Sequence, residues 1–82
     1  MNIEAIDEPI RMLADFSGGH AVPLRFQWSG RTYRIDVVNA RWIDRSGDGY
    51  RLCYSVQVGA ETYFLHFAGG QVQWWLDKVV VE

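Results

Sequence analysis

Apolar and polar residues alternate along most of this chain after residue 20. The clearest stretch reads Phe26-x-Trp28-x-Gly30-Arg31-x-Tyr33-x-Ile35, and the period of two returns in Tyr50-x-Leu52-x-Tyr54-x-Val56, Tyr63-x-Leu65-x-Phe67 and Trp74-x-Leu76. Successive side chains of a β-strand point to opposite faces, so this period indicates strands that are buried on one face. The pattern therefore predicts an all-β fold.

Clusters of glycine and polar residues divide the chain into short segments. They stand at 17–20, 29–31, 46–49, 58–61 and 68–71. Glycine supplies the positive φ that tight hairpins need, so five turns are expected to separate six strands. These strands are predicted at 10–16, 21–28, 32–43, 50–58, 62–67 and 72–80. Consecutive antiparallel strands form a meander, and a small meander removes its free edges best by curling into a barrel or roll.

The N-terminal segment does not share the period of two. Isoleucines at positions 3, 6 and 10 have helical spacing, but Pro9 interrupts it. We expect residues 1–9 to be loosely ordered, with a short helix over 2–8 as the alternative. The whole chain, 1–82, is expected to form a single small β-domain, because it is too short for a second core.

The phase of the alternation assigns the predicted core. Leu24 shares its parity with Phe26 and is expected to point inward. Trp42 has the opposite parity to Tyr33, but a bulge near residues 37–39 would return it to the core, and bulges are a common way to bend long barrel strands. The large side chains expected to be buried are Trp28, Tyr33, Trp42, Tyr54 and Trp74.

No stretch of the chain has the pattern of an export signal or a membrane span. The first eight residues lack both a basic start and an apolar segment, and no apolar run approaches the ~18 residues of a spanning helix. A single cysteine excludes an intramolecular disulfide, as is usual in reduced compartments. We therefore expect a cytoplasmic protein with no membrane partner.

Charge is distributed unevenly along the chain. The net charge is only −2, but residues 25–51 carry six arginines against three aspartates. Arginine offers a planar fork that suits phosphate, carboxylate and aromatic faces. Four of these arginines, at positions 25, 34, 41 and 51, are expected on the outward face of neighbouring strands, with the outward-facing Trp75 nearby. The candidate residues for contact with a protein partner or with nucleic acid are Arg25, Arg31, Arg34, Arg41, Arg51 and Trp75.

The sequence predicts no catalytic, cofactor or metal site. His20, Cys53 and His66 lie on separate predicted strands at unrelated spacing, whereas metal sites need converging ligands. Cys53 and His66 would meet as nucleophile and base only if their strands paired in that register, and no third group orients them. Asp44 and Asp48 flank a glycine-rich loop that lacks the spacing of a calcium site and is expected to be a solvated hairpin.

The motifs quoted above also resemble a known family. The stretch from Phe26 to Ile35, a tryptophan seven residues on, the Arg51-x-x-Tyr54-x-Val56 segment and the final Trp74-Trp75-Leu76-x-x-Val79 resemble short bacterial β-domains of unknown function. Relatives of that family are similar to the C-terminal extension of some inactive Y-family polymerase proteins of translesion DNA synthesis. The resemblance covers about residues 20–80 and implies a small non-catalytic domain that works beside DNA-repair proteins.

Together these features predict a cytoplasmic protein-interaction module that is not an enzyme and holds no cofactor. Its predicted partner is another protein. The alternative is an accessory nucleic-acid-binding domain associated with DNA repair. The two differ in their dependence on salt, because phosphate contacts weaken steeply with ionic strength.

Overall fold

A computed structural model describes residues 1–47 and 49–82 of the chain, so Asp48 of the predicted hairpin loop lies outside the described residues. The fold is all-β, as predicted. A 3₁₀ turn, Ser17–Gly19, follows the first strand. The strands are β1 (Asn2–Asp15), β2 (Val22–Trp28), β3 (Arg31–Arg34), β4 (Val37–Asp44), β5 (Arg51–Val58), β6 (Glu61–Ala68) and β7 (Gln73–Val81).

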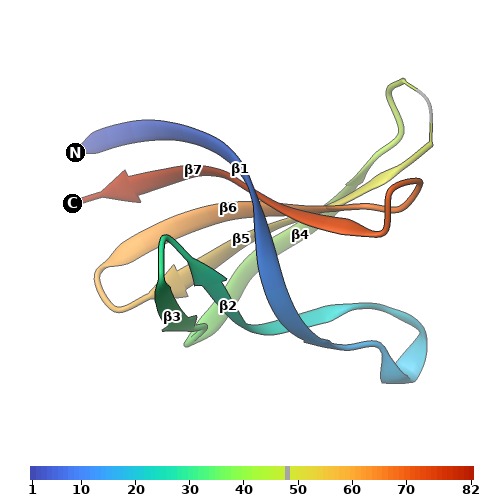
Figure 1. Ribbon diagram of the computed structural model, residues 1–82, viewed down its shortest axis with the longest axis horizontal. Helices are drawn as coiled ribbons and strands as arrows, with labels where there is room; N and C mark the ends of the chain where they lie inside the picture. The colour runs from blue at the N-terminus through green and yellow to red at the C-terminus, as the bar shows by residue number, and fades with distance from the viewer. Residues whose placement is uncertain (48) are drawn as a thin grey trace.

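These strands form one antiparallel sheet in the order β3-β2-β1-β7-β6-β5-β4, which curls into a half-barrel. β1 serves both halves of the sheet: its residues 2–10 pair with β7 and its residues 11–15 pair with β2. Figure 1 shows β1 running beside β7, with the two chain ends adjacent, and then curving away toward β2. An irregularity between Ala5 and Glu8, where Asp7 has a φ of 54°, interrupts the pairing before the curve.

The sheet has seven strands rather than the predicted six, because the segment predicted as one strand over 32–43 is divided. The division falls at Ile35 and Asp36. The Ile35 N–H donates to the Leu24 carbonyl at 3.0 Å, and the Asp36 N–H donates to the Gln57 carbonyl at 2.9 Å. The chain thus hydrogen-bonds to β2 at Ile35 and already to β5 at Asp36. As a result β3 and β4 stand at opposite ends of the strand order, and the half-barrel stays open between them.

The N-terminal segment corrects a second expectation. Residues 2–9 form neither the alternative helix nor a loosely ordered start, but the first part of β1. Asn2 to Ala5 pair with Lys78 to Val81 of β7. The helical spacing of the isoleucines was misleading because it says nothing about a strand partner more than seventy positions away.

The core lies on the concave side of the sheet. Its largest fully buried side chains are Phe26, Leu65, Leu76, Val56 and Pro23. Among the predicted core residues, Tyr54 and Trp74 are buried, while Trp28 and Tyr33 are half-buried and pack against the core. The Phe26 ring stacks on Tyr33 at a centroid distance of 5.1 Å and meets Tyr63 edge-on at 5.5 Å.

Two core assignments were wrong, because strand irregularities change the phase. Trp42 is 46% exposed, although the predicted bulge is present between Val38 and Ala40. The turn at Ile35 and Asp36 shifts the phase once more, so the two shifts cancel and Trp42 pairs with Cys53 on the outer face. Leu24 is 44% exposed because it is the extra residue where β2 pairs irregularly with β1.

Candidate interaction surfaces

The structure places the six candidate contact residues in separate surroundings. Arg25 and Arg34 are directly opposite each other on β2 and β3. They lie at the other end of the strand order from Arg41 on β4 and Arg51 on β5. The four arginines were expected on one set of neighbouring strands. They instead lie at two opposite ends of the strand order.

Arg25 and Arg34 belong to a basic face on the outer side of β1, β2 and β3. Residues that pair across strands share a face, so the register defines this one. Its six residues are Arg11, Leu13, Arg25, Gln27, Thr32 and Arg34. Arg11 lies on the predicted strand 10–16 but was not among the candidates, because these were drawn from the arginine-rich residues 25–51.

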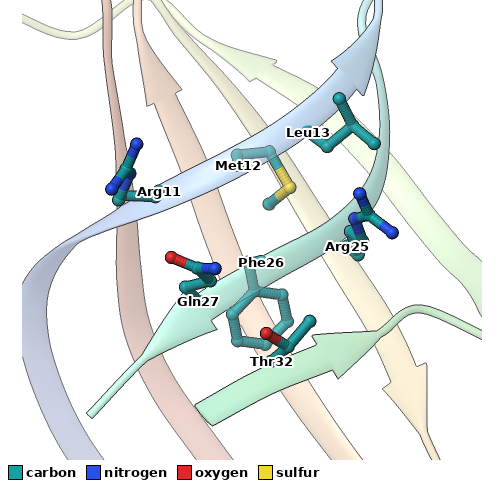
Figure 2. Close-up of a pocket in the computed structure, with 7 residues that line it drawn as sticks. All are labelled: Arg11, Met12, Leu13, Arg25, Phe26, Gln27 and Thr32. Carbon is teal, nitrogen blue, oxygen red and sulfur yellow. The ribbon is translucent and has the colours of Figure 1, made fainter. Parts of the chain in front are cut away.

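A shallow hollow of about 500 Å³ lies at the basic face and includes Arg11, Arg25, Gln27 and Thr32 in its lining. Figure 2 shows Arg11 beside Gln27 and Leu13 beside Arg25, with β1 and β2 side by side. Met12 and Phe26, which also line the hollow, belong to the opposite parity and pack in the core. The side chains that border the hollow on the outer face are therefore the polar donors Arg11, Arg25, Gln27 and Thr32, together with Leu13.

Arg31 and Arg41 lie away from the basic face. Arg31 pairs with Trp28, and its guanidinium lies 5.9 Å from the centroid of the Tyr33 ring, on the core side of β3. Arg41 pairs with Tyr54, whose side chain is part of the core, so Arg41 also leaves its strand on the concave side. Both arginines are exposed to solvent at the margin of the core.

Arg51 and Trp75 line the same hollow, of about 330 Å³, on the convex side of the sheet. The hollow is also lined by Tyr50, His66 and Asp77. The Trp75 ring is nearly parallel to the His66 ring, with centroids 6.2 Å apart. The Trp75 Nε1–H donates to Gln71 Oε1 at 3.3 Å, so the tryptophan is held in place and is only half-exposed.

His66 and Asp77 form an acid–base pair within this hollow. His66 is 8% exposed, and its Nδ1 lies 2.7 Å from Asp77 Oδ1. Burial raises the pKa of the Asp77 carboxyl, and this outweighs the opposing influence of the histidine. Sequence reasoning missed Asp77, because a contact between β6 and β7 depends on the register of two strands.

The pairing places Cys53 directly opposite His66, so the register required for a nucleophile and base is present, with Asp77 as an orienting group. Other features oppose that role. Burial raises the pKa of the Cys53 thiol, with the charges of Asp44 and Asp77 acting in the same direction. Within the described residues, the hydrogen bond of Cys53 Sγ goes to the Arg51 carbonyl at 3.9 Å and not to His66. The thiol is therefore protonated and unactivated at neutral pH.

Residues 1–47 and 49–82 contain no cluster of three or more His, Cys, Asp or Glu side chains that would hold a metal ion. No helix in the same residues has the length and apolar character of a membrane span.

A further surface, which the sequence analysis did not identify, follows the free edge of β4. β4 stands at the end of the strand order and pairs with β5 on one side only. Large apolar side chains are exposed along it, with Val37 at 54%, Trp42 at 46% and Ile43 at 53%. The sequence carried one signal of this surface. Trp42 and Ile43 are adjacent, and successive side chains of a strand point to opposite faces, so the strand cannot bury both against one core.

An edge groove runs between β4 and the start of β2. Its first part, of about 320 Å³, is lined by Ala21, Val22, Pro23, Val38, Asn39, Ala40, Arg41 and Tyr54. A second part, of about 270 Å³, shares Arg41 and Tyr54 and extends to His20, Trp42 and Ile43. The buried Tyr54 hydroxyl donates to the Ala21 carbonyl at 2.5 Å and fixes the two walls relative to each other.

Comparisons of the chain with protein-family models, curated proteins and solved structures give no match. The resemblance to short bacterial β-domains, like the cytoplasmic location, stays a prediction.

Proposed function

We propose that this chain is a protein-interaction module that binds an extended segment of another protein along the free edge of β4. One observation carries the proposal: an eight-residue strand, hydrogen-bonded on one side only, borders a groove between large exposed apolar side chains. Trp42 and Ile43 are the largest of these. Exposed apolar side chains at a free sheet edge are a liability unless a partner covers them.

Strand addition supplies both affinity and specificity at such an edge. The backbone N–H and C=O groups of β4 that point away from β5 can pair with an added strand, and alternate side chains of that strand enter the groove. The opposite wall competes little, because Pro23 has no N–H to offer. The added segment therefore pairs its backbone with β4 and packs its side chains against the wall at Ala21 to Pro23.

The charge at the groove favours an acidic segment. Arg41 lines both parts of the groove, and no carboxylate of the described residues lies within 4.0 Å of its guanidinium. The acidic residues nearby are engaged: Asp36 Oδ2 accepts the Gly59 N–H, and Asp44 Oδ1 accepts hydrogen bonds from Ser46. The proposed partner segment is thus extended, apolar at alternate positions, and carries a carboxylate that meets Arg41.

Binding of a synthetic peptide tests this proposal. The probe is a capped peptide as long as β4, with alternating valine and threonine and one central glutamate, added to isotope-labelled protein. We expect amide shifts along β4 and at Ala21 to Val22. A peptide N-methylated at alternate residues, which cannot pair its backbone with β4, should bind far more weakly, as should one with lysine in place of glutamate.

Two protein variants locate the binding site. Ile43→Ser should weaken binding, because it removes the apolar side chain at the margin of the groove. Val72→Ser is the matched control: Val72 is 77% exposed in a turn away from β4, so this substitution should have no effect on binding. Equal binding by the N-methylated peptide, equal loss in both variants, or no shifts along β4 would each overturn the proposal.

A further inference from the structure

The basic face of β1, β2 and β3 carries a charge that the fold does not neutralise. Arg25 and Arg34 are directly opposite on neighbouring strands, and Arg11 is diagonal to Arg25 across the next pair. Among the described residues, the acid–base pair within 4.0 Å is His66 with Asp77, on other strands. Like charges placed directly opposite destabilise an antiparallel pair. These arginines therefore oppose folding where they stand.

Asp15, the acidic residue at the end of β1, does not relieve this repulsion. Asp15 lies two residues beyond Leu13, but its Oδ1 accepts the N–H of Ser17 at 2.8 Å, which turns it toward the following turn. Leu13 itself is half-exposed beside Arg25. The basic face thus presents three guanidinium groups and an apolar side chain, with no carboxylate on the face.

The donors on this face suit phosphate groups. Guanidinium forks match phosphate oxygens in pairs, and the Gln27 amide and Thr32 hydroxyl line the same hollow as Arg11 and Arg25 (Figure 2). A nucleic-acid strand carries a negative charge on every nucleotide, so it can meet a row of closely spaced arginines across three strands. None of the six residues of the face is aromatic, so bases have no ring to stack on.

We propose that the basic face binds the phosphate backbone of a nucleic-acid strand. Arg11, Arg25 and Arg34 contact phosphates, and Gln27 and Thr32 donate hydrogen bonds beside them. Contacts of this kind position a strand without reading its sequence. The site is separate from the edge groove of β4 and independent of the peptide that the groove accepts.

The dependence of affinity on salt tests this proposal. The probe is a fluorescently labelled oligothymidylate, titrated with the full chain at several salt concentrations. Three phosphate contacts to a single strand give a slope of about −2 for the logarithm of the association constant against that of salt concentration. Raising the salt about fourfold should then weaken binding roughly fifteen-fold. An oligoadenylate of equal length should bind with the same slope.

Variants test whether the salt dependence of binding comes from the basic face. Replacing both Arg25 and Arg34 with glutamine should reduce it to about −0.7, the value for one remaining contact. Arg45→Gln removes one arginine charge from an exposed position beyond β4 and should leave the slope unchanged. The double variant should melt no lower than the wild type, since it removes a repulsion; thermal melting therefore separates lost binding from lost folding.

Three outcomes would overturn the proposal. One is the absence of oligonucleotide binding at low salt, and another is a slope that Arg45→Gln lowers as much as the double variant does. The third is tighter binding of a polyglutamate peptide than of the oligonucleotide to the same arginines, which would assign the face to an acidic protein instead.

Discussion

Trp74 and Trp42 occupy opposite environments in one sheet, although both are large aromatic residues on strands. The Trp74 ring packs between Tyr54 and Phe67, with centroid distances of 5.5 and 5.2 Å. Trp42 lies on the outer face at the free edge, where nearly half of it is exposed. An exposed tryptophan contributes little to the core but offers apolar area and a polar N–H to a partner.

Alanine substitutions should separate these two roles. Trp74→Ala should lower the free energy of unfolding by about 3 to 5 kcal/mol, because it leaves a cavity among packed rings. Trp42→Ala should cost less than about 1 kcal/mol, since its ring is not enclosed. Denaturant unfolding of both variants measures the difference, and equal losses would show that Trp42 is packed in the core.

Tyr63 predicts how stability changes at high pH. Burial, with a smaller contribution from the charge of Glu61, raises the pKa of the Tyr63 hydroxyl to about 12. In the unfolded chain the group titrates near its ordinary value of about 10, so above that pH the unfolded state loses the proton first. Stability should therefore fall as pH rises from about 10 toward 12.

Replacing Tyr63 with phenylalanine should remove the part of the alkaline loss of stability that Tyr63 causes. Spectrophotometric titration of tyrosinate provides the measurement: the phenol that titrates last should be missing in Tyr63→Phe. The idea fails if all tyrosines of the wild type titrate together near pH 10 while the protein is folded.

At the scale of elements, local pattern was a good guide to strands and a poor guide to their irregularities. Alternation from Arg51 to Val58 predicted β5 within one residue, because both faces of that strand keep a constant phase. The corner at Ile35 and Asp36 could not be predicted in the same way. It exists because two successive N–H groups find acceptors on β2 and β5, which are distant in sequence.

The corner should depend on the Asp36 side chain. Its Oδ2 accepts the Gly59 N–H at 2.8 Å and so ties the corner to the turn between β5 and β6. Asp36→Ala should lower the free energy of unfolding by about 1 kcal/mol, the net value of such a hydrogen bond. Asp36→Asn keeps an acceptor and should retain most of it. Equal destabilisation by alanine and asparagine in denaturant unfolding would contradict this role.

At the scale of the whole molecule, the half-barrel leaves surfaces that only the strand order reveals. The sequence predicted arginine as the chemically active residue type, but the pairing separates Arg25 and Arg34 from Arg41 and Arg51. The edge of β4 was hidden because a closed barrel and an open one share the same alternation. Which strand ends without a neighbour is decided by non-local hydrogen bonds, and the local sign of the β4 edge is limited to the adjacent residues Trp42 and Ile43, which alternation cannot bury together.

Hydrogen exchange of the β4 amides, with and without the valine–threonine peptide, shows whether the edge of β4 is open and accepts an added strand. In the free protein, amides of β4 that bond to β5 should exchange slowly and the remaining ones fast. Adding the peptide should slow the fast group and leave the amides of β6 unchanged. Uniformly slow exchange along β4 in the free protein, or fast amides that the peptide does not slow, would contradict the account.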